Sequence, residues 1–455
     1  MTKLSAVAVS ILLLVGAVPA YGWLLDYQDP NGSHDLSIGS DWFRVTSMAD
    51  PTSKDGNVGP PSKFDIGSIR TGSSESLNAT LRFKDLNIGG QAITDPNLRP
   101  VTETVVTVGT GGLLETYDVD GTSSTANLVV GYPYNGKLVV DGGTVRALES
   151  ADPNYFSHLY LGGRNSGATA TLEVHDGLVQ FGRMYGGWNN ATAVINQDGG
   201  TIKSELRWDA TNAVATGCTF YFAYSNPASA TWNLSGGTAM MSADAAGSGY
   251  YFTWRGGTAL FNQTGGSAYW GDNVFFGRSS GNAFGDSKAE FRLLGGRTTV
   301  GVGNLYMGTG GAAYFSSGKF KVNQAGVLDC DGSFVSESTL DKIELVISSA
   351  SDFQMDVAGN LTWANPTFSV DLGSYSPAVG QTWKVADVGG TISLPADGYH
   401  PDRARYNFYD PVSLLEYCLY KDTPNSDLRL EYVPEPATLV LLGLGGLGLL
   451  RRRRS

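Results

Sequence analysis

A pattern of strand, glycine turn and strand recurs six times in the middle of this sequence. In each copy apolar and polar residues alternate, a Gly-Gly or Asp-Gly turn follows, and a second short strand begins. The copies cover residues 138–145, 172–179, 193–202, 230–239, 259–268 and 289–298. Alternation with a period of two predicts half-buried strands, and glycine supplies the positive φ that tight turns need. The first glycines of these turns follow one another after 22 to 37 residues, at Gly142, Gly177, Gly199, Gly236, Gly265 and Gly295.

Strands and turns that repeat at periods of roughly 20 to 50 residues are typical of solenoids. Each coil would stack on the next at about 4.8 Å and pair its backbone with that of its neighbours. The mature chain shows no segment with a helical period of about 3.6 residues and helix caps. We therefore predict an all-β fold, a right-handed parallel β-helix over residues 23–333. A β-propeller is the alternative, although its blades need about 40 residues at a regular spacing.

The sequence changes character after Cys330. Glycine pairs become rarer, and longer strands are predicted at residues 342–347, 367–372, 382–388 and 428–433. A solenoid needs a cap at its end, because an open strand edge would pair with further chains. We therefore expect a separate all-β cap, similar to a small β-sandwich, at residues 334–432.

Both ends of the chain carry features of transport signals. Residues 1–22 contain Lys3, an apolar run and small residues before a cleavage site near Ala20 or Gly22, which predicts a signal peptide. The other end joins a Pro-Glu-Pro motif and a fourteen-residue apolar run over 437–450 to an arginine cluster, the motif residues being Pro434, Glu435, Pro436, Arg451, Arg452, Arg453 and Arg454. A helix of that length covers only about 21 Å of a bilayer core about 30 Å thick. The arginines would remain on the cytoplasmic side, so we expect a short hydrophobic sorting helix.

The C-terminal arrangement over residues 433–455 resembles the PEP-CTERM sorting signal of bacteria. The resemblance implies that an exosortase-type membrane protease processes the tail after its transient insertion into the inner membrane. It also implies export of the body to the cell surface or the extracellular matrix, where exopolysaccharide and other surface glycans would be within reach. Within the body, residues 59–69 and 77–83 resemble the opening coil of autotransporter-like β-helical surface proteins.

Composition narrows the set of partners further. The formal charge is −12, and removal of Lys3 and the four terminal arginines takes it to −17. An acidic body disfavours binding to nucleic acid. The cysteines, Cys218, Cys330 and Cys418, form no C-x-x-C pair, so neither a disulfide scaffold nor a metal site is expected. A single bridge between Cys330 and Cys418 and a set of three buried thiols remain as alternatives.

Three aspartates are the candidates for catalysis. Asp141, Asp176 and Asp198 each precede a turn glycine in successive copies of the repeat. If those copies stack, the carboxylates form a ladder that would share a calcium ion or serve as an acid/base pair in a polysaccharide lyase or hydrolase. Asp-Gly is also a preferred turn dipeptide, which explains the three residues without any chemistry. We expect no catalysis, no cofactor and no metal site, since the four histidines show no metal-ligand spacing either.

Two aromatic clusters would be able to bind sugars by stacking. Tyr250, Tyr251 and Trp254 form the first cluster, and Tyr269 and Trp270 form the second. The same residues would serve equally well as buried strand residues. We predict a non-enzymatic, exported structural or adhesion protein of the cell surface or extracellular matrix. The alternatives are a carbohydrate-active β-helix enzyme and a non-catalytic carbohydrate-binding protein.

Overall fold

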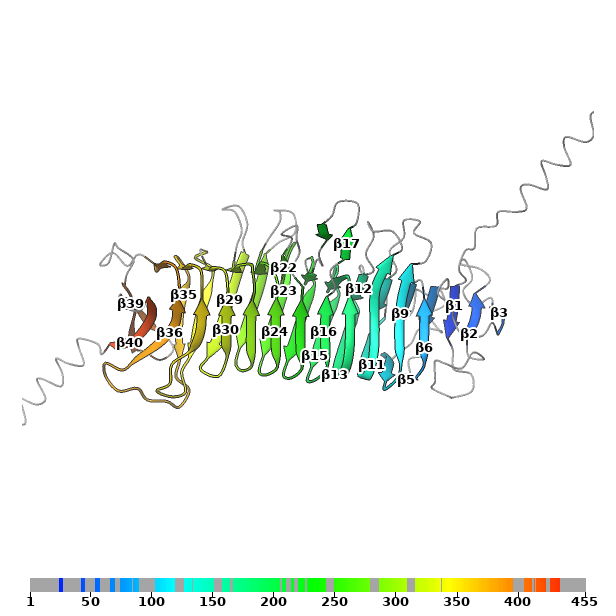
Figure 1. Cartoon of the computed structure of the whole chain (residues 1–455), viewed down its shortest axis with the longest axis horizontal. Coiled ribbons are helices and arrows are strands. Elements are labelled where there is room, and N and C mark those ends of the chain that lie inside the picture. The colour runs from blue at the N-terminus through cyan, green and yellow to red at the C-terminus, as the bar shows by residue number, and fades with distance from the viewer. Residues whose placement is uncertain are drawn as a thin grey trace, which may run out of the picture.

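The computed structural model of the chain is an elongated stack of β-strands (Figure 1). The structure describes residues 24–27, 42–45, 54–57, 66–69, 74–83, 85–89, 103–118, 127–132, 134–150, 158–163, 167–204, 207–209, 214–216, 220–225, 227–242, 249–278, 286–308, 316–336, 338–395, 405–410, 413, 415–422 and 426–433. The expected signal peptide, the sorting motif from Pro434 onward and Cys218 lie outside these residues. In the described part, no helix is long and apolar enough to cross a membrane.

Each coil contributes one strand to sheet A and two to sheet B, where they form rows B1 and B2. Sheet A contains, in spatial order, β3 (Lys54–Asn57), β2 (Trp42–Val45), β1 (Leu24–Tyr27), β4 (Ile66–Ile69), β7 (Asp85–Ile88), β10 (Asn127–Val130), β12 (His158–Leu161), β14 (Arg183–Gly186), β19 (Phe220–Phe222), β22 (Tyr250–Tyr251), β25 (Val274–Phe276), β28 (Leu305–Met307), β31 (Phe334–Ser336), β34 (Leu361–Trp363) and β37 (Ile392–Ser393).

The strands of sheet B lie on both sides of the glycine turns. Row B1 contains β5 (Ser74–Leu77), β8 (Thr104–Gly109), β15 (Thr192–Gln197), β20 (Ser229–Leu234), β23 (Gly257–Gln263), β26 (Ser287–Leu293), β29 (Ser316–Asn323), β32 (Lys342–Val346) and β35 (Thr367–Asp371). Row B2 contains β6 (Thr80–Phe83), β9 (Leu113–Asp118), β16 (Thr201–Ser204), β21 (Thr238–Met241), β24 (Ser267–Trp270), β27 (Arg297–Val300), β30 (Val327–Cys330), β33 (Gln354–Val357) and β36 (Thr382–Val388). Two long strands belong to both rows, β11 (Gly136–Ser150) and β13 (Thr169–Phe181).

Parallel pairing between successive coils fixes the coil length. Leu172 pairs with Ile195, 23 residues further on, and Ile195 pairs with Trp232 after 37 residues. The next partners are Phe261 and Phe291, after steps of 29 and 30 residues. These steps match the spacing of the glycine turns, so the prediction of an all-β stack with long parallel sheets is confirmed. The right-handed sense of the coil stays a prediction.

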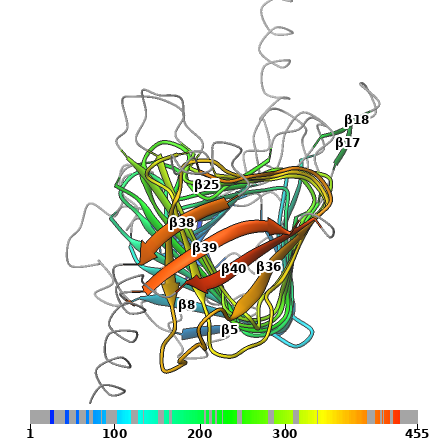
Figure 2. The same ribbon diagram turned by 90° about the vertical axis from the view of Figure 1, so that its left-hand side faces the viewer.

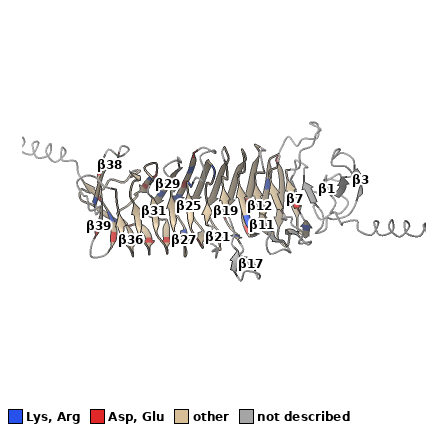
Figure 3. Cartoon of the chain, turned by 90° about the horizontal axis from the view of Figure 1, so that it is seen from above, with Lys and Arg blue, Asp and Glu red and all other residues tan. Residues whose placement is uncertain are grey.

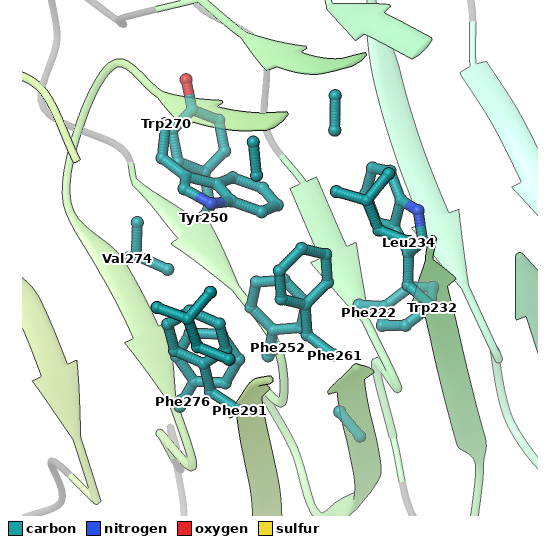
Figure 4. Close-up of a cluster of buried hydrophobic side chains, with 14 of the residues drawn as sticks. Phe222, Trp232, Leu234, Tyr250, Phe252, Phe261, Trp270, Val274, Phe276 and Phe291 are labelled. Atoms are coloured by element: carbon teal, nitrogen blue, oxygen red, sulfur yellow. The ribbon is translucent and has the colours of Figure 1, made fainter. Parts of the chain in front are cut away.

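The interior of the stack is apolar, and its middle part is rich in aromatic side chains (Figure 4). The register places Trp232, Phe261 and Phe291 of row B1 one above another, and all three are buried. From the side of sheet A, Phe252 stacks on Phe276 with ring centroids 4.2 Å apart, and Phe276 stacks on Phe291 at 5.0 Å. Burial of such apolar surface, at about 25 cal/mol per Å², is the main stabilising contribution to the stack.

The turns between rows B1 and B2 need glycine for two reasons. A Cβ atom on Gly236 would lie 2.1 Å from the carbonyl oxygen of Asp198 in the preceding coil, so a side chain has no room there. The next residue, Gly237, has a φ of +71°, which favours glycine. The buried amide of Gln197 donates a hydrogen bond of 2.9 Å to the carbonyl oxygen of Thr238 and so ties one turn to the next coil.

Sheet A extends toward the N-terminus by strands of both directions. β1 pairs in parallel with β4, whereas β2 pairs antiparallel with β1 and with β3. Of the residues that we expected to open the solenoid, 59–65 lie outside the described part, 66–69 form β4, and 77–83 extend from the end of β5 through β6; these strands pair in parallel with β7, β8 and β9. Between β16 and β19 the chain forms a separate two-stranded sheet of β17 (Arg207–Asp209) and β18 (Val214–Thr216).

The parallel stack continues beyond residue 333, where we expected the solenoid to end. β31, β32 and β33 pair in parallel with the preceding coil, and β34, β35 and β36 pair in parallel with them. At this end of the stack the first antiparallel neighbour is β40 (Asp427–Val433), which joins β36 to β39 (Leu415–Asp422) and through it to β38 (Arg405–Asp410).

These three strands lie across the end of the stack as a single sheet (Figure 2), so in the described part of the chain the parallel stack, and no sandwich-like cap, follows residue 334. The physical reason is that parallel pairing does not depend on glycine pairs. Between β32 and β33, residues 347–353 form a longer connection in place of the tight turn, and the register is kept on both sides.

The two described cysteines are buried in different parts of the molecule. Cys330 lies in β30 and Cys418 in β39, and no disulfide joins them. Burial raises the pKa of Cys330 to about 11, so this thiol stays protonated at neutral pH. Of the two alternatives for these cysteines, the structure therefore shows buried thiols and no bridge.

Candidate functional site

Six aromatic side chains form a central column along the outer face of sheet A. Each of them lies between two buried residues of its own coil, as Tyr221 lies between Phe220 and Phe222 in β19. Because neighbouring side chains of a strand point to opposite faces, the middle residue points away from the core. Parallel register places these side chains beside one another in successive coils. The column consists of Tyr160, Tyr185, Tyr221, Tyr251, Phe275 and Tyr306.

Adjacent rings of the central column are stacked. Their centroids are 4.8 to 5.4 Å apart, and their planes differ by 4° to 24°. These distances are close to the strand spacing of about 4.8 Å, so the fold itself brings the rings into contact. Each aromatic pair contributes about 0.5–1.5 kcal/mol beyond the burial of its area. Because the ring faces cover one another, the column presents mainly ring edges to the outside, most of them with a phenol hydroxyl.

A second column begins three residues further along each coil. It consists of Trp188, Tyr224, Trp254 and Arg278. Trp188 lies 5.0 Å from Tyr185 at an angle of 40°, and Trp254 lies 4.5 Å from Tyr251 at 64°. These rings are tilted against their neighbours, so their faces are less fully covered than those of the central column. The two columns together are called the aromatic face.

Arg278 brings a positive charge onto the aromatic face. The centre of its guanidinium group lies 4.6 Å from the ring centroid of Phe275 and 5.3 Å from those of Tyr251 and Trp254. One of its N–H groups donates a hydrogen bond of 3.3 Å to the hydroxyl of Tyr251. Among the residues that the structure describes, Arg278 takes part in no ion pair. Its charge is therefore stabilised by ring faces, which leave N–H donors for a ligand.

In contrast to Arg278, most charged side chains of row B1 form ion pairs. Charged residues are sparse on the described strands (Figure 3), and most of those on β26, β29 and β32 pair with one another. Lys319 lies 3.0 Å from both Glu290 and Glu344. Burial would raise the pKa of Glu344, but hydrogen bonds from Lys321 and Lys319 outweigh it and lower that pKa to about 2. This network is satisfied internally, in contrast to Arg278.

Burial favours the neutral forms of Tyr221 in the central column and of His158 beside it. Burial, supported by the neighbouring tyrosines, raises the pKa of Tyr221 to about 12, so its hydroxyl remains a hydrogen-bond donor at neutral pH. At the N-terminal end of the column, burial and the nearby charge of Arg183 lower the pKa of His158 to about 4. The imidazole of His158 contacts Tyr160 and Tyr185 edge-on, with centroids 5.4 and 5.5 Å away.

Asp141 and Asp176 lie at the bends where β11 and β13 pass from row B1 to row B2, and Asp198 lies on the turn between β15 and β16; all three are exposed. Asp141 and Asp176 pair in register in adjacent coils, as the repeat predicts. Asp198 does not continue this ladder, because its carboxylate lies 2.8 Å from Nδ1 of His175. The carboxylate of Asp176 accepts a hydrogen bond of 2.7 Å from the N–H of Gly177 in its own turn. In the described part of the chain, no three potential ligands come together as a metal site.

The structure separates the members of the two expected sugar-binding clusters. Tyr251, with an exposed fraction of 7%, and the half-buried Trp254 belong to the aromatic face, whereas Tyr250 and Trp270 are core residues with exposed fractions of 0% and 1%. Tyr269 is exposed on β24, away from sheet A. For Tyr250 and Trp270 the core interpretation is therefore correct and surface stacking is wrong.

Sequence reasoning did not find most of the aromatic face. The missed residues are Tyr160, Tyr185, Trp188, Tyr221, Tyr224, Phe275, Arg278 and Tyr306. Their signal is a short motif with an aromatic residue between two apolar or small ones, followed by glycine or alanine, as in residues 159–162, 184–187, 220–223, 274–277 and 305–308. Without the register of sheet A, nothing in these motifs shows that their middle residues stack in one column.

Comparison with known proteins adds information at the C-terminus. Residues 433–454 match the family described as the PEP-CTERM protein-sorting motif. No curated protein and no solved structure matches the chain. The match agrees with the resemblance of the Pro-Glu-Pro motif, apolar run and arginine cluster. The chain therefore carries a PEP-CTERM sorting motif, which implies a protein that is exported, processed by exosortase and sorted to the cell surface.

Proposed function

We propose that this protein is a non-enzymatic structural or adhesion rod of the cell surface or the extracellular matrix. The observation that carries the proposal is the uninterrupted stack from β4 to β36, closed by β38–β40 just before the sorting motif. Such a stack holds its shape through backbone pairing along its whole length. The antiparallel end sheet supports a role as a discrete rod, because it covers the strand edge that would otherwise recruit further chains.

The local contacts of the candidate aspartates support a role without catalysis. Asp176 is engaged with the backbone of its own turn, and Asp198 with His175. A polysaccharide lyase or hydrolase on this fold would need acids and a basic residue around a groove that holds the sugar chain. We therefore place the enzyme alternative behind the structural role.

A non-catalytic carbohydrate-binding role is the second candidate, and the aromatic face favours it. Binding sites for small and linear ligands are lined by aromatic side chains with a few polar groups that fix orientation. The aromatic face combines tilted rings, phenol hydroxyls and one guanidinium group. This role is compatible with a surface rod, since adhesion to a polymer requires no reaction.

Localisation in the producing cell tests the proposed function. The full-length protein should reach the cell surface, and a variant without residues 434–455 should be exported but not sorted there. The truncation spares Val433, which ends β40 and pairs with Glu416, so the folded body stays intact. A matched variant with glutamine at Arg451, Arg452, Arg453 and Arg454 keeps the tail length and should also fail to be sorted. Equal surface levels for all three proteins would contradict the proposal.

A further inference from the structure

We propose that the aromatic face binds an acidic polysaccharide, whose sugar chain lies along the long axis of the stack with a carboxylate at Arg278. The inference rests on the proposed function, which brings the protein to the cell surface or matrix. Two observations support it. The first is the continuous column of aromatic side chains, and the second is the guanidinium group of Arg278 beside that column, which has no acidic partner among the described residues.

The shape of the aromatic face fits a linear polymer. Its columns follow the direction in which the coils stack, with one aromatic position per coil from β12 to β28. A compact ligand would use one or two of these positions, whereas a polysaccharide chain is able to contact all of them. A repeating sugar chain would therefore meet a repeating row of aromatic side chains, and weak contacts would add up over several coils.

The chemistry of the aromatic face suits a sugar, which has apolar C–H surfaces and polar hydroxyl edges. The tilted rings of Trp188 and Trp254 supply apolar surface for the C–H groups. The hydroxyl of Tyr221 is protonated at neutral pH, as an ordinary tyrosine is, and burial raises its pKa further to about 12, so it can exchange hydrogen bonds with sugar hydroxyls. Tyrosine and tryptophan are well suited to such contacts, because each combines a large apolar ring with one polar group.

The charge distribution selects an acidic chain over a neutral one. The protein as a whole carries a formal charge of −12, yet among the described residues two cations lie over rings of the aromatic face, Arg278 over Trp254 and Arg255 over Tyr224, while Asp272 acts on Tyr251 through its charge. The acid next to this region, Asp272, is buried, and the N–H of Asn273 donates to it. A planar guanidinium group binds a carboxylate through two parallel hydrogen bonds, which a hydroxyl cannot replace.

Binding to two forms of one polymer tests the inference. The purified exported protein is titrated with polygalacturonate and, as a control, with its methyl ester, which has the same backbone without charge. We expect polygalacturonate to bind at least about tenfold more tightly, which corresponds to one charge-assisted contact of about 1.4 kcal/mol. Equal affinity for both polymers, or no binding of polygalacturonate, overturns the inference.

Two variants locate the contact on the aromatic face. Arg278→Gln should weaken polygalacturonate binding about tenfold and leave the affinity for the ester unchanged. Trp254→Ala should weaken binding of both polymers, since it removes stacking surface. Arg297→Gln serves as the matched control, because Arg297 lies on row B2 and pairs with Asp329. If Trp254→Ala lowers the unfolding temperature, Arg278→Gln alone decides the result.

Other occupants of the aromatic face give different results in the same experiments. A second copy of the chain would produce a dimer in sedimentation without any polymer, and Arg278→Gln would abolish it; that result overturns the inference. An unchanged affinity for polygalacturonate in Arg278→Gln overturns it as well. Localisation is a separate readout, so a protein that is sorted to the surface but binds no acidic polymer refutes this inference and leaves the proposed function intact.

Discussion

Individual glycines determine whether successive turns can stack, and they do so in two separable ways. Gly111 and Gly237 both have positive φ, +83° and +71°. A Cβ atom on Gly111 would meet nothing within 4 Å, whereas one on Gly237 would lie 2.2 Å from the carbonyl oxygen of Gly199 in the preceding coil. The first position therefore needs glycine for its conformation alone, and the second also needs it for space.

We predict that Gly237→Ala destabilises the protein more than Gly111→Ala. The alanine at residue 111 costs about 1–2 kcal/mol for its left-handed conformation. At residue 237 the contact with the preceding coil adds to this, and the total should exceed about 3 kcal/mol. Urea unfolding of the two variants beside the wild type measures the difference. Equal losses would mean that the turns do not stack as closely as described.

Asp341 is a buried acid between β31 and β32 with an exposed fraction of 0%. Burial raises its pKa to about 6, although the N–H of Gly318 and the hydroxyl of Ser336 each donate to it at 2.8 Å. The folded pKa is higher than the usual value of 3.8. The folded state therefore holds a proton between about pH 4 and pH 6 that the unfolded chain has released, and stability falls as pH rises through this range.

Asp341→Asn should remove this part of the pH dependence, because an amide does not titrate. We predict that the stability difference between wild type and variant changes by on the order of 2 kcal/mol between about pH 4 and pH 6 and is level above pH 7. The lowered pKa of His158 acts in the opposite sense, but it is common to both proteins and cancels in the difference. A difference that stays constant from pH 4 to pH 7 would contradict the buried position of Asp341.

At the level of the strands, the inner face of sheet A packs into the core and its outer face carries the aromatic column. Its inward residues, such as Phe220 and Phe222, fill the core, while Tyr221 between them belongs to the central column. Tyr221 stacks between Tyr185 and Tyr251, with centroids 5.4 and 5.3 Å away. The column therefore links three coils on the outside, in addition to the backbone pairing between them.

We predict that Tyr221→Ala lowers the free energy of unfolding by about 1–3 kcal/mol, because it removes two stacked pairs. Tyr221→Phe keeps the ring and should cost less than about 0.5 kcal/mol. Thermal unfolding followed by near-UV circular dichroism compares both variants with the wild type. If the two substitutions have the same effect, the hydroxyl matters more than the stack, and the column is not the stabilising element described.

The accuracy of the sequence-based interpretation differs between the two sheets for a physical reason. In sheet B the turn glycines are required sterically, as at Gly236 and Gly237, so the sequence marks each turn and the coil length follows. In sheet A a strand of three residues has too little sequence for a period to show. The outward position of Tyr221 depends on its register with Tyr185 and Tyr251, which only the structure gives.

The difference between strands with and without a marked turn also explains why the stack ends later than we expected. We expected the solenoid to end where glycine pairs become rare, but β32 and β33 keep their parallel partners across a longer connection. A tight turn leaves a strong sequence signal, whereas a loop that merely allows the next strand to pair leaves none. The antiparallel strand β40 is the true end of the stack, because it covers β36 with a strand of opposite direction.

In the whole molecule, the folded body comes first along the chain and the sorting motif follows it. The stack runs from β4 to β36, the sheet of β38–β40 closes it, and the PEP-CTERM motif follows at residues 433–454. The antiparallel sheet therefore separates the folded body from the sequence that directs its sorting. Processing within the motif would leave every described strand of the stack intact.

The intact mass of the protein taken from the outer surface of the producing cell shows whether the folded body is sorted there and whether its C-terminal motif is processed. We predict a folded body that has lost the apolar run over residues 437–450 and the four terminal arginines, because exosortase processes the motif. A variant without residues 434–455 should be absent from that surface fraction. A surface protein that still carries Arg451 to Arg454, or a full-mass protein found only inside the cell, would show that the protein is not processed and sorted in this way.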